Sequence, residues 1–338
     1  MKRRNLIVLG LGIGSGMTSA MGVPSPSMAQ PKFLGLPVQS YRFTTVKTTF
    51  SGNSVRITPI PGNSKTLKYI ETSLTLSPVA LPLEMVAIRG GSFQMGITSS
   101  ERNSIIKNRG QPHYNRFYSD EEPQHSVKIP DFYMGRYGVT QAQYQAVMGT
   151  NPSFFKGMNL PVESVHWEDA QEFIRRLREM TGLRYRLPTE AEWEFTARSG
   201  TTTRFSFGDV ISPAVVNCRF PPDPGIKLEK GKQKTIKVSD LYPNFWGLYQ
   251  MHGNVYEWCE DQYYNSYQFK PQALTANGSI PWTQEITNMP PSKNPNFRIL
   301  RGGSWNVLSR NSRLACRYGL HKECRSNGNG FRLALSLS

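Results

Sequence analysis

The chain has 338 residues, of which 38% are hydrophobic and 11% aromatic. This length and composition allow a full hydrophobic core, and they favour one large domain with an N-terminal extension. Forty Lys and Arg residues against 24 Asp and Glu residues give a formal net charge of +16, which favours anionic partners at low salt. No basic run alternates with aromatic residues as in a nucleic-acid groove, so specific nucleic-acid binding is not predicted.

Residues 1–29 have the organisation of an export signal. A basic start at Lys2–Arg4 precedes a short apolar stretch at Leu6–Ile13, and small residues at Ser27–Ala29 supply a cleavage site. The apolar stretch is too short to span a bilayer. The sequence therefore predicts cleavage of this segment and no transmembrane anchor afterwards.

Cleavage at this site predicts a mature protein that begins near Gln30, and cleavage after Ala20 is the alternative. Arg3 and Arg4 also resemble a twin-arginine signal, although ordinary signals often begin with two basic residues. The sequence thus predicts an exported protein, periplasmic or extracellular, and leaves the export route open.

Residues 30–82 form an N-terminal extension that is rich in Ser, Thr and Pro. Two short runs of β-forming residues, Tyr41–Val46 and Ser54–Thr58, are separated and followed by turn residues at 51–53 and 61–63. This pattern predicts a small hairpin or a peripheral strand pair. No catalytic motif is visible in the extension.

Two capping boxes predict the starts of helices in the following domain, which spans residues 83–338. Thr140 has Gln143 three residues later, and Thr189 has a glutamate at the same spacing. The first helix is expected to end at Gly149 and the second near Gly200.

A third helix is predicted over His166–Met180, with Gly182 just beyond its end. Its apolar residues recur at helical spacing and are Ala170, Phe173, Ile174 and Leu177. After Gly200 few long periodic segments remain, so short strands and long loops are expected for the rest of the chain.

The chain has four cysteines, which allow three pairings if all are bridged: Cys218, Cys259, Cys316 and Cys324. Export makes bridging chemically feasible. Cys316 and Cys324 are close in sequence, so a local bridge between them is one alternative. No zinc-binding spacing is present, and structural roles are favoured over a reactive thiol.

The stretch Gly247–Trp258 is predicted to be a sharply bent, buried segment. Gly247 and Gly253 permit backbone angles that other residues rarely adopt. Glu257 lies among large aromatic residues and therefore needs a cation, a network of donors or a metal. Calcium is a natural candidate, because it accepts carboxylate, amide and carbonyl oxygens together.

This stretch resembles the Gly-Leu-Tyr-Asp/Asn-Met-x-Gly-Asn-Val/Ala-Trp-Glu-Trp signature of the formylglycine-generating enzyme family, also called the sulfatase-modifying factor family. Further blocks follow the family order, namely Met85–Gly96, Phe132–Thr140, Pro161–Trp167, Arg186–Glu194, Arg301–Trp305 and Gly330–Arg332. The resemblance implies an α+β fold that is C-type-lectin-like, with little regular secondary structure and a few short helices.

The resemblance also implies where the active cleft lies. The family oxidises a substrate cysteine at a copper ion that two cysteines hold shortly after the Arg-Gly-Gly-Ser block. Residues 305–315 contain no cysteine here, and Cu(I) prefers thiolates, so copper is not expected. Ser304 matches the family's active-site serine, Tyr256 replaces its tryptophan, and Arg317 matches an arginine. Together with Trp305 these residues are the expected cleft.

A structural calcium site is implied by the same signature. Its ligands would be the side chains of Gln250 and Glu257 and the backbone carbonyl groups of Gly253 and Val255. Gln250 keeps an oxygen but lacks the charge of the aspartate found in the family, so calcium binding is expected to be weaker.

The remaining titratable residues predict no other catalytic constellation. The five histidines are scattered, and His252 is expected to be a hydrogen-bonded structural residue. The carboxylates of Asp120–Glu122, Glu190, Glu192 and Glu194 are expected to be solvated or to cap helices.

Two classes of function follow from the sequence. The first is an exported, non-oxidase binding or accessory module that presents a loop at residues 305–329 to a protein, a carbohydrate or an anionic ligand. This loop is rich in hydrogen-bond donors, which are Asn306, Arg310, Asn311, Arg313, Arg325, Asn327 and Asn329. They are equally compatible with an ordinary exposed loop. The alternative class is a formylglycine-generating oxidase that acts on a cysteine of a sulfatase-type protein, or another enzyme that uses the same cleft.

Overall fold

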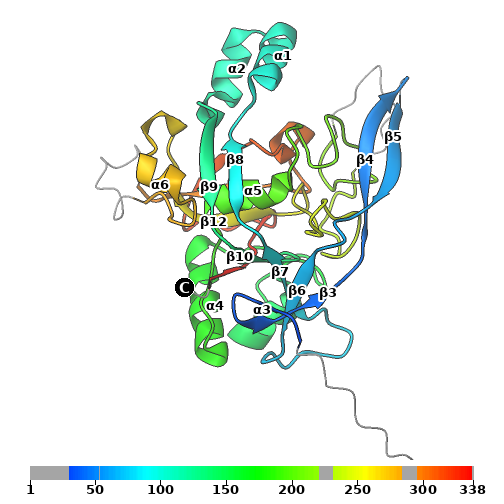
Figure 1. Ribbon diagram of the computed structural model, residues 1–338, viewed down its shortest axis with the longest axis vertical. Coiled ribbons are helices and arrows are strands. Elements are labelled where there is room, and N and C mark those ends of the chain that lie inside the picture. Colours follow the sequence, from blue (N-terminus) through cyan, green and yellow to red (C-terminus); the bar gives the residue numbers. More distant parts are fainter. Residues whose placement is uncertain (1–29, 53, 221–230, 284–294, 337–338) are drawn as a thin grey trace, which may run out of the picture. The chain divides into compact units, whose positions relative to one another are not determined.

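The computed structural model describes residues 30–52, 54–220, 231–283 and 295–336 (Figure 1). The predicted export signal lies outside the described residues. The chain from Pro31 onward forms one compact unit. In the described part of the chain, no helix has the length and apolar character needed to cross a membrane.

Short strands and a few helices make up the regular structure. The strands are β1 (Lys32–Phe33), β2 (Leu36–Pro37), β3 (Gln39–Ser40), β4 (Thr44–Ser51), β5 (Ser54–Pro61), β6 (Leu67–Glu71), β7 (Leu83–Ile88), β8 (Gly91–Met95), β9 (His125–Ile129), β10 (Phe132–Gly135), β11 (Tyr185–Arg186), β12 (Tyr256–Gln262), β13 (Phe297–Arg301), β14 (Tyr318–His321), β15 (Asn329–Gly330) and β16 (Ala334–Leu335). The helices are α1 (Ser99–Arg109), α2 (Gln111–Phe117), α3 (Gln141–Met148), α4 (Trp167–Thr181), α5 (Glu190–Arg198) and α6 (Gln272–Ala276), with 3-10 turns η1 (Ser119–Glu121), η2 (Tyr267–Phe269) and η3 (Ser309–Ser312).

The larger sheet contains six antiparallel strands in the order β11-β16-β10-β7-β6-β3. Strands β3 and β6 come from the N-terminal extension, and β6 pairs with β7 at the start of the following domain. The C-terminal strand β16 lies between β10 and β11. Backbone hydrogen bonds therefore join the extension, the middle and the C-terminus of the chain in one sheet.

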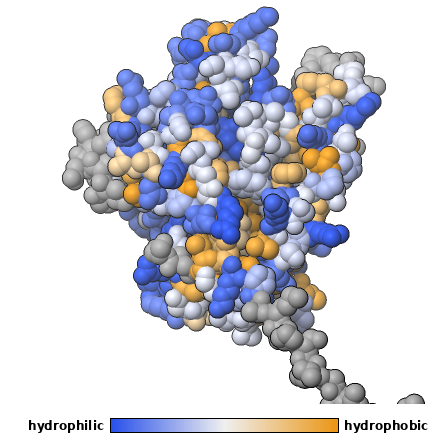
Figure 2. All heavy atoms as spheres, in the orientation of Figure 1, coloured by the Kyte–Doolittle hydropathy of each residue, from blue (hydrophilic) through white to orange (hydrophobic). Residues whose placement is uncertain are grey.

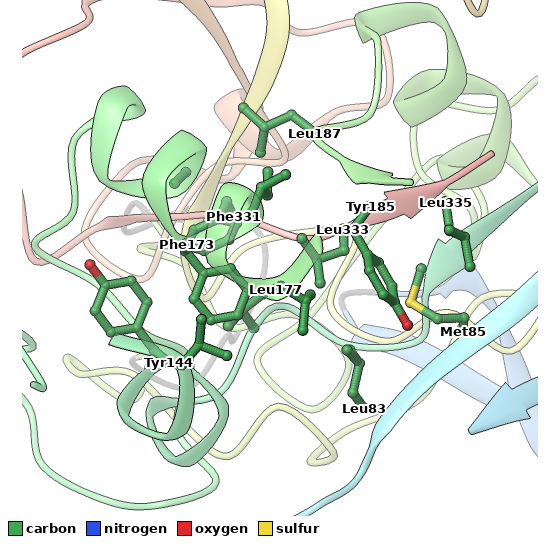
Figure 3. Packing of buried hydrophobic residues seen from close by; sticks show 14 of the residues in the cluster. Leu83, Met85, Tyr144, Phe173, Leu177, Tyr185, Leu187, Phe331, Leu333 and Leu335 are labelled. Atoms are coloured by element: carbon green, nitrogen blue, oxygen red, sulfur yellow. The ribbon is translucent and has the colours of Figure 1, made fainter. Parts of the chain in front are cut away.

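The core beside this sheet explains the third predicted helix. Phe173 and Leu177 project from one face of α4, because residues four apart lie on the same side of a helix. They meet Tyr144 of α3 and Phe331 near the C-terminus (Figure 3), and the rings of Tyr144 and Phe173 stack with centroids 5.5 Å apart. Each such buried side chain contributes about 1.5–3 kcal/mol of hydrophobic stabilisation.

The predicted helix boundaries are confirmed. Thr140 and Thr189 each form a complete capping box at the starts of α3 and α5. Gly149 and Gly182 end α3 and α4 in the left-handed conformation, with φ of +79° and +69°. Ser199, one residue before the predicted glycine, takes this conformation after α5.

Helices α1 and α2 were not predicted, although one signal was present. The Thr98 side chain accepts a hydrogen bond from the Glu101 backbone N–H at 3.1 Å, which caps the start of α1. Few apolar residues follow this cap, so the helix lacks a clear hydrophobic stripe. Ile105 supplies its buried apolar contact.

The predicted hairpin in the extension is present, and it is longer than the sequence runs indicated. Strands β4 and β5 pair over eight positions, from Thr44 opposite Pro61 to Ser51 opposite Ser54. The Thr48 backbone N–H donates to the Phe207 carbonyl group at 2.8 Å. This bond fixes the hairpin to the later part of the chain.

All four cysteines are unbridged. Cys218 and Cys259 are buried, whereas Cys324 is exposed, and the local bridge between Cys316 and Cys324 that the sequence suggested is absent. The smaller, four-stranded sheet, β14-β13-β12-β15, carries the residues next to the expected cleft.

Candidate functional site

The turn after β13 positions Ser304. Gly302 and Gly303 both have positive φ, +92° and +76°. A Cβ atom at Gly303 would lie 2.4 Å from the Ser312 hydroxyl oxygen, and one at Gly302 would lie 3.0 Å from the Trp193 ring. Both positions therefore require glycine, and the chain reverses tightly enough to bury Ser304.

Ser304 and Trp305 lie against the Asn254 segment and the loop before β15. The Ser304 hydroxyl donates to the Asn306 side-chain oxygen at 2.6 Å, and only 1% of Ser304 is exposed. The Trp305 backbone N–H donates to the Asn254 carbonyl group, and its indole N–H donates to the Asn327 carbonyl group, both at 2.9 Å. The side-chain polar groups of both residues are thus used within the protein.

Tyr256 and Ser304 both lie against Gly328. Its backbone N–H donates to the carbonyl group of Gly328, and a Cβ atom on Gly328 would lie 3.1 Å from the Ser304 hydroxyl oxygen. The Tyr256 ring stacks on Tyr318 with centroids 5.2 Å apart. Burial raises the pKa of Tyr256 far above neutral pH, so this phenol remains protonated. Tyr318 is 42% exposed and presents an aromatic face to solvent.

Phe155 and Gly328 are site residues that the sequence analysis missed. The Phe155 ring meets Trp305 edge to face, with centroids 5.4 Å apart. A Cβ atom on Gly328 would lie 3.1 Å from the Ser304 hydroxyl oxygen and 3.2 Å from the Asn306 side-chain oxygen, so a side chain there would crowd this pair. Neither residue belongs to a recognisable catalytic pattern, so no local signal identified them.

Arg317 is the fourth residue expected at the cleft, and its guanidinium is engaged by other segments of the chain. Its guanidinium donates to both carboxylate oxygens of Glu190, at 2.7 and 3.0 Å, and to the backbone carbonyl groups of Asp120 and Tyr264. It also lies 4.1 Å from the centre of the Tyr267 ring. The structure therefore places Arg317 in a buried ion pair, where its donors are already used.

The glutamates of α5 are also buried, which corrects the expectation that they are solvated. Glu192 does cap its helix, but it also forms a two-point ion pair with Arg186 at 2.6 and 2.7 Å. Glu194 pairs with Arg198 and Arg301. The capping alternative therefore holds for Glu192, and the solvated alternative was wrong because α5 is enclosed on every side, which helical periodicity does not reveal.

Electrostatics keep Glu190 ionised in the core. Burial alone would raise the pKa of its carboxyl group, but Arg317 and Arg301 outweigh burial and lower the pKa to about 2. In Glu194, burial is likewise outweighed by Arg198 and Arg301, and its pKa is lowered.

Residues expected on the surface elsewhere are buried as well. Glu121 is fully buried and pairs with Arg313, whose guanidinium also donates to Glu101 at 3.0 Å. Asn329 is 4% exposed. Arg313 and Asn329 therefore leave the set of donors that the 305–329 loop offers to a ligand, because long-range ion pairing and strand formation bury them.

His252 is the structural residue that the sequence predicted. Its Nδ1 lies 2.7 Å from the Ser312 carbonyl oxygen, and its Nε2 accepts a hydrogen bond from the Ser206 backbone N–H at 3.0 Å. Nδ1 must therefore carry the proton. Burial lowers the pKa of His252 to about 4, so the ring is neutral at neutral pH.

Glu257 is paired with side chains of the protein itself. Arg332 donates to one carboxylate oxygen from Nε at 2.5 Å and to the other from Nη2 at 2.7 Å, while the Trp193 indole N–H adds a third bond at 2.7 Å. Arg332 also donates to the carbonyl groups of Tyr249 and Gly135, each at 2.9 Å. A guanidinium thus supplies the positive charge that this buried carboxylate needs.

The predicted calcium ligands fit a calcium ion poorly in this arrangement. Gln250 donates through its amide nitrogen to the Lys237 carbonyl group at 2.7 Å, and its oxygen accepts from Asn254. Glu257, the single carboxylate of the set, is neutralised by Arg332. Calcium prefers six to eight oxygens with unpaired carboxylates among them. Within the described ranges, no three His, Cys, Asp or Glu side chains gather as a metal-binding group.

After chelator treatment, we expect millimolar calcium to leave the melting temperature of the protein unchanged. A bound ion would raise this temperature, because a ligand that binds only the folded state adds to stability. Gln250→Asp is the matched variant, since it adds a charge at a position with φ of +51° that Asp tolerates. Melting scans with and without calcium compare the two proteins. A calcium-dependent rise in the unsubstituted protein would show that the signature binds the ion despite Arg332.

The residues after Ser304 do not fit copper. Val307 packs partly buried against the core, and Ser312 is fully buried with its carbonyl group held by His252. Cys316 follows this segment, and burial raises the pKa of its thiol to about 12. A protonated thiol without a second cysteine beside it is a poor ligand for Cu(I).

Comparison with known proteins now identifies the family. Residues 73–337 match the model of the sulfatase-modifying factor enzyme 1-like domain. The chain belongs to this family. The matched region begins at 73, so it includes the end of the predicted extension, and strands β1–β6 precede it.

Relatives in this family have different names. The chain is 29% identical to the chaperone protein LppX of Paenibacillus barcinonensis over 66% of this chain and 78% of that protein. It is 32% identical to the formylglycine-generating enzyme of Streptomyces coelicolor, and the match covers about half of each chain, 52%. The structure of PvdO from Pseudomonas aeruginosa is similar, with 26% identity, a TM-score of 0.58, and coverage of 79% of this chain and 99% of that one. The C-type-lectin-like α+β fold is thereby confirmed.

Proposed function

We propose that this member of the sulfatase-modifying factor family is an exported binding or accessory module that does not oxidise cysteine at copper. The observation that carries the proposal is the segment 305–315, which has no thiol and whose Ser312 is fully buried beneath His252. Rebuilding a copper site would require a second thiolate beside Cys316, and the exposed Cys324 is the nearest cysteine in sequence.

The surface beside Ser304 and Tyr256 supports binding by its chemistry. Tyr318 offers an exposed aromatic face stacked on Tyr256, and aromatic faces of this kind bind the apolar faces of sugars and peptide side chains. Asn306 adds an exposed amide nearby in the chain, which suits carbohydrate, anionic or protein ligands, whereas the exposed Arg325 is already paired with Asp169. A relative named as a chaperone is compatible with an accessory role.

The alternative is a formylglycine-generating oxidase, which the names of other relatives favour. One assay separates the two functions. Reduced protein is incubated with Cu(I), oxygen and a cysteine-bearing sulfatase peptide, and the aldehyde is sought by mass spectrometry. We expect no product, while the Streptomyces coelicolor enzyme serves as the positive control. Turnover that disappears in Cys316→Ala would establish the oxidase instead.

A further inference from the structure

A groove separates the N-terminal hairpin from α1, at a distance in sequence from the Ser304 cleft. It has a volume of about 600 Å³ and is walled by β4–β5, by α1 and by the loops at 204–211 and 309–313. Figure 1 shows the hairpin and α1 projecting on the same side of the sheets. The hairpin precedes the family match at residue 73, so this groove depends on a part of the chain outside the family domain.

The hairpin is held firmly enough to act as a wall. Besides the backbone bond to Phe207, the Thr48 hydroxyl donates to the Val210 carbonyl group at 2.5 Å. Gly208 allows this close approach, because a Cβ atom there would lie 2.6 Å from the Thr48 carbonyl oxygen. These bonds hold the middle of β4 against the segment at 207–210.

The groove combines an apolar lining with aromatic side chains at its rim. Ile105, Phe205 and Phe220 line it, and Phe50 at the end of β4 is 60% exposed. Figure 2 shows hydrophobic side chains at the surface among hydrophilic ones in the region of the hairpin. An exposed aromatic beside an apolar concavity is typical of a binding surface.

The charge of the lining is positive. The lining contains four arginines and two carboxylates, and two of these arginines, Arg204 and Arg313, already lie against Glu101. Glu101 accepts a hydrogen bond from Arg313, and Asp209 accepts one from the Arg204 backbone N–H at 3.1 Å. Arg109 has no ion-pair partner among the described residues, and the Arg310 guanidinium lies over the Phe117 ring rather than against a carboxylate.

We infer that this groove binds an acidic peptide segment of a partner protein, with a large apolar side chain in the groove and carboxylates against Arg109 and Arg310. Arginine pairs with carboxylates through two parallel hydrogen bonds, which suits it to this recognition. A volume of this size holds a few side chains, not a folded domain. The inference is independent of the Ser304 cleft, so either can fail alone.

Fluorescence anisotropy tests this inference with three labelled peptides. One contains Glu, Gly and Phe, one has Lys in place of Glu, and one has Gly in place of Phe. We expect only the first to bind well, and we expect its affinity to fall steeply with added salt. Equal binding of the Phe-free peptide, or displacement by a single-stranded oligonucleotide of equal charge, would reveal a nonspecific basic surface and overturn the inference.

Matched variants locate the binding. Phe50→Ser and Arg109→Glu should each weaken binding of the acidic aromatic peptide by about tenfold, since each removes one contact of the kind that dominates such interfaces. Arg116→Glu makes the same charge change in the last turn of α2, and Arg116 does not line the groove. It should change affinity by less than about twofold. All three positions are exposed, so folding is preserved, and an Arg116 effect equal to that of Arg109 would contradict the inference.

Discussion

Arg332→Met is expected to lower the free energy of unfolding by about 3–5 kcal/mol, because removing one partner of a buried ion pair leaves the other charge uncompensated. Arg332 is fully buried and donates to both oxygens of Glu257. It also binds the carbonyl groups of Tyr249 and Gly135, so the substitution breaks bonds from three separate segments. Met retains much of the side-chain volume, which limits the contribution of a cavity.

Denaturant unfolding followed by tryptophan fluorescence measures this loss. Arg175→Met is the control, because Arg175 forms ion pairs with Glu172 and Glu179 on the exposed face of α4. We expect that variant to unfold at the same denaturant concentration as the unsubstituted protein. The double variant Arg332→Met/Glu257→Gln should recover part of the stability, since it removes the orphaned carboxylate. A loss in Arg332→Met no greater than in Arg175→Met would mean that Glu257 has another counter-ion.

Glu190→Gln is expected to be similarly destabilising at neutral pH, by about 3–5 kcal/mol, because Arg317 would lose its buried carboxylate. The ion pair between Glu190 and Arg317 also makes the free energy of unfolding depend on pH in the acid range. The folded-state pKa of Glu190 is about 2, below its ordinary value of 4.5. Its contribution of about 3 kcal/mol is therefore fully present above pH 4.5 and is lost as the pH falls from 4.5 to 2.

Stability measured from pH 7 down to pH 2 tests the sign of this linkage. The difference in unfolding free energy between the unsubstituted protein and Glu190→Gln should shrink as the pH falls through this window. Glu179→Gln is the control, since Glu179 is exposed near the end of α4 and pairs with Arg175 at the surface. It should follow the unsubstituted protein throughout. A difference that is independent of pH would show that Glu190 is not ionised in the folded protein.

Local signals predicted the helices well. The capping boxes at Thr140 and Thr189 and the glycines at 149 and 182 act within a few residues, so the sequence alone identifies them. The cap at Thr98 was equally local and was missed because few apolar residues follow it.

Local sequence patterns did not predict which residues form the buried ion pairs. The need of Glu257 for a partner was apparent from its aromatic neighbours, but Arg332 lies 75 positions away in the sequence. Glu190 and Arg317 are 127 positions apart, so neither reveals the other by spacing. The aromatic neighbours of Glu257 predicted that it needed neutralisation, whereas Glu190 was expected to be solvated or to cap its helix. Only the fold determines which charges meet.

A competition titration for Cu(I) tests most directly the claim that this family fold lacks a copper site here. Reduced protein competes with a chromophoric Cu(I) chelator under anaerobic conditions, and Cys316→Ala and Cys324→Ala are titrated in parallel. We predict that the protein and both variants leave the metal with the chelator, because residues 305–315 supply no thiolate. Withdrawal of one Cu(I) per chain from the chelator, abolished in Cys316→Ala, would contradict the account.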